Sequence, residues 1–300
     1  MRAVEAYVAY LRNEKGLAEN SVNAYLPGVR VFVDDCVARD GDFYPDRLDA
    51  AAVESTLLDR IPELSASRSR LLVAALRSFL RFLFYKGQVG LDLSVSVPAY
   101  RGHNYIIPAF LSPEEMETVL ATPDRATSRG LRDFAILLLL ARLGLRASEV
   151  VHLELDDIGW RDGCIVIRGK GRTLESLPLL SEVGDALAVY LCEGRPKSQS
   201  RRVFIRTNAP RSGFRGPAAI GHIVRLALAR AAIRPSRRGA AHLFRHGLAT
   251  KMIRAGATLT EISQVLRHRV ETSTEIYTHL AFETLREVAR PWPKRTGGHP

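Results

Sequence analysis

Apolar side chains recur at helical spacing along most of the chain, and this pattern gives way to short β-type runs only after Gly163. A helix buries residues spaced three or four apart, whereas a strand alternates its faces at every second residue. The β-type runs are residues 164–167 and 174–179, with a glycine-rich turn at 169–172 between them, and residues 203–205 are a further candidate strand. The helical pattern then returns in the last third of the chain. The sequence therefore predicts a mainly α protein with a small antiparallel β-sheet.

The first 95 residues are predicted to form a separate all-α domain. Four amphipathic segments precede Gly87, a typical helix stop, and Ser21 is expected to cap the second of them, which contains the helix-disturbing Pro27. After a linker marked by prolines, Ser112 is expected to cap the first helix of a second domain. The expected boundaries are a helical domain at 1–95, a linker at 96–108, a second domain at 109–290 and a tail at 291–300.

Positive charge is concentrated in the second domain. The formal net charge is +11, yet the first 100 residues carry 12 Lys and Arg against 13 Asp and Glu. No acidic residue lies between Glu193 and Glu261, a stretch that carries 15 Lys and Arg. Such a one-signed block attracts a polyanion, so nucleic acid is the expected partner. The alternative is a basic surface that serves only solubility.

Several classes of protein are disfavoured. The longest apolar run, residues 134–141, is far shorter than the roughly 20 residues that span a bilayer. Charges interrupt the first residues, so no secretory signal is expected. The three cysteines are scattered and form no CxxC, which argues against a disulfide framework or a zinc site. We expect a soluble, cytoplasmic protein with no membrane partner and no metal centre.

Two motifs before residue 172 carry polar groups suited to phosphate chemistry. Arg146 follows a leucine-rich helix, with Glu149 three residues later to orient it. Lys170 is one of only six lysines among 43 basic residues and lies on the glycine-rich turn. An ammonium can release a proton when its pKa is lowered, which a guanidinium cannot. Taken singly, Arg146 and Glu149 are better explained as a surface ion pair, and Lys170 is explained equally well as an exposed turn lysine.

Two further motifs follow the β region. His242, Arg245 and His246 share one face of a helix. Two histidines four residues apart can bind zinc, but the acid-free stretch around them favours phosphate over metal. Tyr277 is the only tyrosine within or after that stretch, and neighbouring cations favour its phenolate as a nucleophile. A structural histidine and a half-buried helix tyrosine are the alternatives.

Together these groups suit phosphoryl transfer without a metal. Arginines bind the non-bridging oxygens, a tyrosine attacks phosphorus, and a lysine protonates the departing oxygen. In this combination the sequence resembles the tyrosine recombinase (phage integrase) family and is similar to its Xer-like branch. The resemblance rests on LGLRASEV, GKG, HLFRHGLAT and LRH followed nine residues later by the tyrosine of EIYTH. It covers nearly the whole chain, because YVAYLRNEKGLAENSVNAY looks like the opening of the family's core-binding domain.

The resemblance implies six catalytic residues and one supporting acid. In the family, the lysine is the general acid for the 5′-hydroxyl leaving group, and the tyrosine forms a 3′-phosphotyrosyl link to DNA. The matching positions are Arg146, the supporting acid Glu149, Lys170, His242, Arg245, His268 and the nucleophile Tyr277. The chain departs from the family at Arg267, where Gly is usual, and at Phe244, where Leu is usual. The larger residue at 267 is expected to alter the helix start or to add a phosphate contact.

The resemblance also implies an architecture and partners. A SAM-like core-binding domain at 1–95 and a catalytic domain at 109–290 would clamp double-stranded DNA, with no metal, ATP or other cofactor. The expected assembly is a homo-tetramer on two duplexes, or a hetero-tetramer with a related recombinase. The candidate DNA-binding residues are Arg68, Arg70, Arg77 and Arg81 on the fourth helix, Arg172 beside the turn lysine, and Arg267.

The favoured function is site-specific DNA recombination that integrates or excises a mobile element. Xer-type resolution of chromosome or plasmid dimers is the alternative role. Two other activities remain open, namely a DNA-binding regulator without catalysis and a type IB topoisomerase. The presence of all six catalytic-type groups argues against the regulator, and the small size and the N-terminal domain argue against the topoisomerase.

Overall fold

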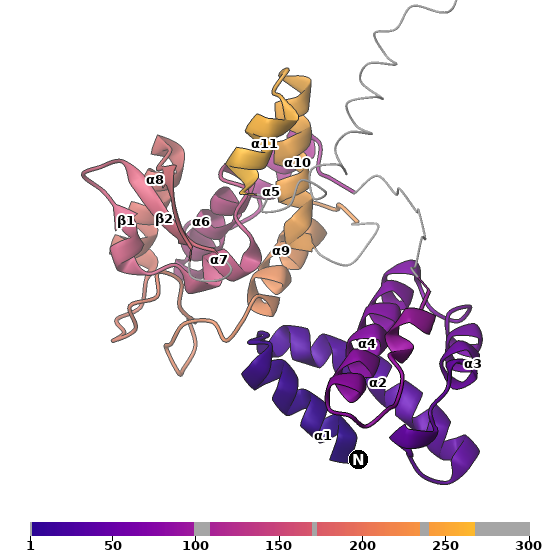
Figure 1. Ribbon diagram of the computed structural model, residues 1–300. Coiled ribbons are helices and arrows are strands. Elements are labelled where there is room, and N and C mark those ends of the chain that lie inside the picture. Colours follow the sequence, from indigo (N-terminus) through magenta and orange to yellow (C-terminus); the bar gives the residue numbers. More distant parts are fainter. Residues whose placement is uncertain (1, 99–108, 170–172, 235–239, 268–300) are drawn as a thin grey trace, which may run out of the picture. The chain divides into compact units, whose positions relative to one another are not determined.

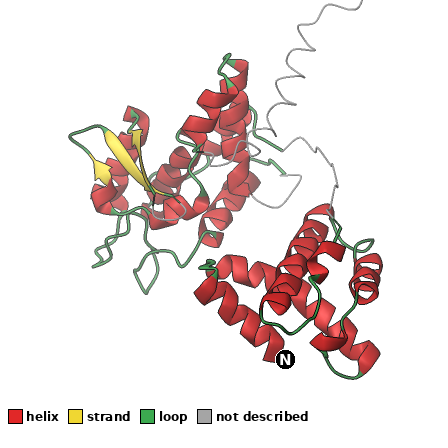
Figure 2. Cartoon of the chain, in the orientation of Figure 1, coloured by secondary structure: helices red, strands yellow, loops and turns green. Residues whose placement is uncertain are grey.

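The computed structural model describes residues 2–98, 109–169, 173–234 and 240–267. The chain divides into two units, Met1–Tyr105 and Ile106–Pro300 (Figure 1). Helices dominate both, and the strands lie in the second unit (Figure 2). The predicted fold class, mainly α with a small antiparallel sheet, is confirmed. Among the described residues, no helix is long and apolar enough to cross a membrane.

Within residues 2–98, helices pack around an aromatic core. In chain order the elements are α1 (Arg2–Ala9), a π-helical turn (Tyr10–Glu14), α2 (Glu19–Asp40), a 3₁₀ turn (Pro45–Arg47), α3 (Ala50–Arg60), α4 (Ala66–Tyr85) and a 3₁₀ turn (Leu93–Ser96). The ring centroid of Tyr7 lies 5.1 Å from that of Phe79 and 5.4 Å from that of Phe82. These rings hold α1 against α4, because edge-to-face and tilted contacts add to the apolar burial.

Helix α2 differs from the sequence prediction at its start and in its middle. The cap predicted at Ser21 is wrong, since the N-cap is Ala18, three residues earlier, and it makes no side-chain cap hydrogen bond. The helix also continues through Pro27 without a break. Packing on α4 offsets the lost backbone hydrogen bond, because a Cβ added at Gly28 would lie only 3.2 Å from a side-chain atom of α4.

The described part of the second unit is built around α6. Its helices are α5 (Pro113–Leu120), α6 (Ser128–Arg142), α7 (Ala147–His152), α8 (Ser181–Val189), α9 (Ala218–Arg230), α10 (Ala240–Arg254) and α11 (Leu259–Leu266). Helix α6 is buried from Ala135 to Ala141 and contacts α5, α7, α8, α9 and α10. The predicted cap at Ser112 is confirmed, as its hydroxyl accepts from the Glu115 N–H at 3.1 Å. Helices α10 and α11 pack side by side (Figure 1).

The sheet has three antiparallel strands in the order β1 (Ile158–Gly159), β2 (Cys164–Arg168) and β3 (Leu174–Pro178). The Gly169 N–H donates to the Thr173 carbonyl at 2.7 Å and closes the β2–β3 hairpin around residues 170–172, which lie outside the described residues. Residues 203–205 form no strand, contrary to the prediction. All three are fully buried in the core, so they lack the alternation of faces that a half-exposed strand requires.

Candidate active site

The Leu-Gly-Leu-Arg motif forms a tight turn between α6 and α7. Gly144 has φ 58°, and a Cβ on it would lie 2.8 Å from the Leu266 Cδ2 atom. Both the left-handed backbone and the close approach favour glycine. The Gly144 carbonyl accepts a hydrogen bond from Arg245 Nη1 at 2.6 Å. The turn that ends α6 therefore positions an arginine of α10.

Arg146 and Arg245 meet where α11 ends. Arg146 is the N-cap of α7, and its Nη2 donates to the Arg267 carbonyl at 3.1 Å. Arg245 Nη2 donates to the carbonyl of the preceding residue, Leu266. Arg245 is 4% exposed, whereas 36% of the Arg146 side chain is exposed and accessible to a ligand. Two guanidinium groups that are distant in the sequence are thus held on consecutive carbonyls.

Glu149 holds this arrangement from inside the protein. Its Oε1 accepts from Arg146 Nη1 at 2.8 Å, and its Oε2 accepts from the Arg146 N–H at 2.8 Å and from Arg267 Nη2 at 2.8 Å. Burial alone raises the pKa of Glu149, but the charge of Arg267 and the bonds from Arg146 outweigh it and hold this pKa below its usual value. The pair predicted between Arg146 and Glu149 is therefore partly buried, with the carboxylate inside the protein, and is not an exposed helix pair.

Helix α10 places two neutral imidazoles next to these arginines. Desolvation and the charges of Arg245 and Arg146 lower the pKa of His242, although part of this residue is exposed. Burial, with His242 and Arg245, lowers the pKa of His246 to about 4. The two ring centroids are 6.3 Å apart. At neutral pH both rings are uncharged, so His242 is able to accept a proton from a reacting group.

Arg267 lies in the interior rather than on an exposed face. It has φ 55° and its guanidinium is directed at Glu149, so the geometry does not favour the predicted phosphate contact. Sequence reasoning found the departure from Gly at this position but missed the contact with Glu149 and the neighbouring Glu175 on β3. The available signal was a bulky residue at a helix C-terminus that usually takes glycine.

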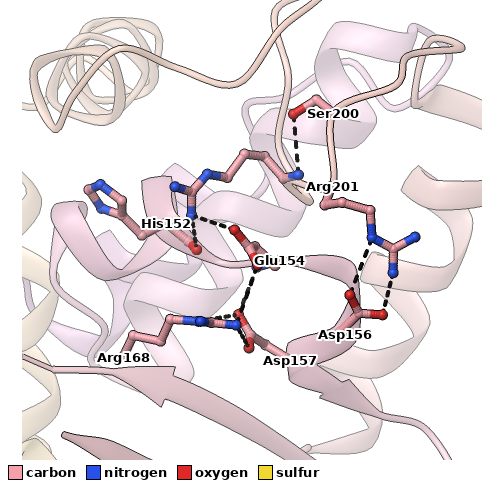
Figure 3. Close-up of polar contacts among 8 residues, drawn as sticks. His152, Glu154, Asp156, Asp157, Arg168, Ser200 and Arg201 are labelled. Carbon is pink, nitrogen blue, oxygen red and sulfur yellow. Dashed lines mark hydrogen bonds and ion pairs between the residues drawn. The ribbon is translucent and has the colours of Figure 1, made fainter. Parts of the chain in front are cut away.

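A second polar network holds the strand that leads to Lys170 (Figure 3). Buried Asp157 accepts from Arg168 Nη2 at 2.7 Å, and its other oxygen accepts from the Glu154 N–H at 2.9 Å. Glu154 also pairs with Arg202 at 3.3 Å, and the Arg202 guanidinium donates to the His152 carbonyl. The end of β2 is thereby held against the segment that follows α7. Sequence reasoning missed this network, for which the acidic run 154–157 was the signal.

The remaining predicted residues fall into two groups. On α4, Arg68, Arg70 and Arg81 are exposed, whereas Arg77 donates from Nη2 to the Val97 carbonyl at 2.8 Å. Lys170, Arg172, His268 and Tyr277 lie outside the described residues. Within the part of the chain that the structure describes, no group of three or more His, Cys, Asp or Glu side chains could hold a metal ion.

Both units match known domain families. Residues 4–87 match the phage integrase N-terminal SAM-like domain, and residues 109–284 match the Phage integrase family. The chain belongs to the phage integrase family. It is a tyrosine-type site-specific recombinase that breaks and rejoins DNA.

The recombinase is similar both to integrases and to Xer proteins. It is 43% identical over 292 residues to "Putative integrase/recombinase y4rA" of Sinorhizobium fredii, covering 97% of this chain and 70% of that one. It is 31% identical over 306 residues to the tyrosine recombinase XerC of Oceanobacillus iheyensis, covering 99% and 97%. A crystal structure of XerH bound to a palindromic difH substrate has the same fold, with a TM-score of 0.76 at 20% identity, covering 97% and 84% of the two chains.

Proposed function

We propose that the recombinase cuts one DNA strand by attack of the Tyr277 Oη on the scissile phosphate. The Tyr277 O–P bond forms as the bond from phosphorus to the 5′ oxygen breaks, which leaves a 3′-phosphotyrosyl link and a free 5′-hydroxyl. A 5′-hydroxyl from a partner strand reverses the step. Because the covalent link conserves the phosphodiester energy, the reaction needs neither a metal nor a nucleotide.

The observation that carries this proposal is the meeting of Arg146 and Arg245 on consecutive carbonyls immediately before His268. Fixed guanidinium groups stabilise the charge that develops on non-bridging oxygens, and they do so best when held before the reaction. Arg146 has the exposed side chain that can reach such an oxygen. In this mechanism His268 adds a further contact to the phosphate.

Proton transfer is assigned to Lys170 and His242. Lys170 protonates the 5′ oxygen as it leaves, a role that an ammonium can fill and a guanidinium cannot. The hairpin that carries it is closed by the Gly169–Thr173 bond and held by Arg168, two residues before the lysine. His242 is neutral at pH 7 and assists the removal of a proton from the nucleophile.

Strand exchange joins two duplexes, and cutting both strands of each needs four nucleophiles. We therefore propose four protomers on two DNA sites. The XerH complex contains a palindromic substrate, and a palindromic site matches a two-fold pair of protomers. Arg68, Arg70 and Arg81 on α4 are exposed and available to bind the DNA backbone. Arg172 is assigned to the same task.

Integration or excision of a mobile element is the biological role that we propose. The 43% identity to a protein named integrase/recombinase, against 31% to a XerC, supports this choice over dimer resolution. A plasmid assay with the DNA that flanks the gene separates the two roles. Joining of two different flanking ends supports the mobile-element role, whereas conversion of plasmid dimers to monomers at one site supports the Xer role.

A covalent-trapping assay tests the chemistry. Nicked duplexes from the flanking DNA are incubated with protein, with and without EDTA, and run on a denaturing gel. We expect an EDTA-resistant adduct with the wild type and with Tyr85→Phe, an exposed control tyrosine, and none with Tyr277→Phe. An adduct that persists in Tyr277→Phe, or that EDTA abolishes, contradicts the proposal. Native-gel binding without any adduct, across a genomic fragment library, would favour a DNA-binding regulator.

A further inference from the structure

Arg267 has a backbone conformation that disfavours its own side chain. It is the C-cap of α11, with φ 55° and ψ 52°. Among the described residues only Ala232, at φ 56°, is another non-glycine residue with positive φ. A side chain in the left-handed region is strained, and strain of this kind persists only where the surroundings hold it in place.

Contacts of the Arg267 guanidinium keep the residue in this left-handed conformation. Only 5% of the Arg267 side chain is exposed, and its Nη2 donates to Glu149 Oε2 at 2.8 Å. Among the described residues its Nε has no hydrogen-bond partner, and it lies 3.5 Å from Glu175 Oε2 on β3. Arg267 therefore connects the start of α7, the end of α11 and strand β3, the second strand of the β2–β3 hairpin.

We propose that Arg267 is a positioning residue for Arg146, an inference that rests on the assignment of Arg146 to phosphate binding. The Arg267 side chain holds one oxygen of Glu149, so that the other oxygen is directed at Arg146 Nη1. The Arg267 carbonyl holds Arg146 Nη2 at 3.1 Å. One residue thus fixes both ends of the Arg146 guanidinium, once through Glu149 and once directly.

The charges around Glu149 give this proposal a pH signature. Arg146 and Arg267 contact the carboxylate, and Glu175 faces Arg267 from β3. On α10, His242 interacts electrostatically with Arg245 and Arg146. The charge of Arg267 is the largest influence that lowers the pKa of Glu149 against burial. Without that charge, Glu149 takes up a proton at a higher pH and releases Arg146, so cleavage is lost earlier as the pH falls.

Arg267→Gly is the decisive variant, because glycine accepts the left-handed backbone and keeps the carbonyl while removing the cation. Ala232→Gly is the matched control, since it relieves the other positive φ at an exposed residue that takes no part in these contacts. The rate of adduct formation on a nicked duplex is measured from pH 5 to 8.5. For Arg267→Gly we expect a rate about tenfold lower at pH 7 and an acid limb displaced upward by about one pH unit. Ala232→Gly should match the wild type, and Arg267→Lys should restore most of the loss.

Three results would overturn the proposal. These are a wild-type profile for Arg267→Gly, an equal loss at every pH, or a failure of Arg267→Lys to restore the rate. Weaker binding with a smaller salt dependence and no change in the pH profile would instead make Arg267 a phosphate contact.

A second measurement separates this inference from the proposed function. Unfolding by urea is followed at pH 7 and pH 4 for the same variants. Arg267→Gly should lose less stability on acidification than Ala232→Gly, because without Arg267 the folded protein also protonates Glu149 as the unfolded chain does. Equal losses would overturn the link between Arg267 and Glu149. If the wild type forms no adduct, the proposed function fails, while this comparison still decides the contact.

Discussion

Two carboxylates of the second unit make the same local contacts in different surroundings. Glu149 accepts the N–H of Arg146 at the start of α7, and Asp157 accepts the N–H of Glu154 at the start of the next helical turn. Each also accepts from a distant guanidinium, at 2.8 Å from Arg267 and at 2.7 Å from Arg168. The side chains of both acids are buried.

The difference lies in the arginines. Arg267 has 5% of its side chain exposed, whereas Arg168 has 47%. When its buried partner is removed, Arg168 can recover water, but Arg267 stays buried with only the longer pair to Glu175. Hydrogen-bond distances alone therefore do not show which network contributes more to stability. The exposure of the arginine does.

The largest effect is expected for Glu149→Gln. This variant leaves the buried Arg267 with only Glu175, 3.5 Å from its Nε, as a counter-charge, so the free energy of unfolding should fall by about 3 kcal/mol. Urea unfolding followed by tryptophan fluorescence measures it, because Trp160 lies in the second unit and the first unit contains no tryptophan in its sequence. The matched control is Glu154→Gln in the other network, for which we expect a loss below about 1 kcal/mol. Equal losses would remove the distinction between the networks.

A pH titration of stability should give the next largest effect. The pKa of His246 is about 4 in the folded protein against 6.5 for an ordinary histidine, so the unfolded chain binds an extra proton between these values. Stability is therefore lost as the pH falls from 6.5 to 4. In His246→Gln, we expect this loss to shrink by about 2 kcal/mol. His152→Gln, an exposed histidine in the other network, is the control, and an equal change there would contradict the assignment to His246.

Asp157→Asn should have a smaller effect than Glu149→Gln. It loses a charge-assisted bond to Arg168, but that arginine is half exposed, so we expect a loss of about 1.5 kcal/mol in unfolding free energy. Because Arg168 lies two residues before Lys170, adduct formation should also slow. A stability loss as large as that of Glu149→Gln would show that the exposure of Arg168 does not matter.

The smallest effect is expected for Arg201→Ala. Arg201 pairs with Asp156, and both side chains are largely exposed, so the change in unfolding free energy should fall within the error of a urea titration. The contrast is Arg195→Ala, since Arg195 donates to the carbonyls of Val203, Ser200 and Arg202 and should cost more. A larger loss from Arg201→Ala than from Arg195→Ala would reverse this ranking.

The sequence predicted helix caps and turns correctly where they depend on a few residues that are adjacent in the chain. The capping box at Ser112 and the hairpin after Gly163 depend on neighbours in sequence, and both are present. The predicted cap at Ser21 and the predicted strand at 203–205 were wrong for a different reason. The start of α2 and the burial of 203–205 are set by packing against distant elements, which local periodicity does not record.

The sequence by itself determined the fold class and the family, because motif order and helical periodicity are properties of the chain alone. It also singled out Arg146, Arg245 and Glu149. Only the tertiary structure decided that Arg146 and Arg245 meet on consecutive carbonyls and that Arg267 is directed inward to Glu149. The sequence shows the same residue type whether an arginine lies on the surface or in the core. Its role depends on which carboxylates and how much water surround it, and these are set by helices far apart in the sequence.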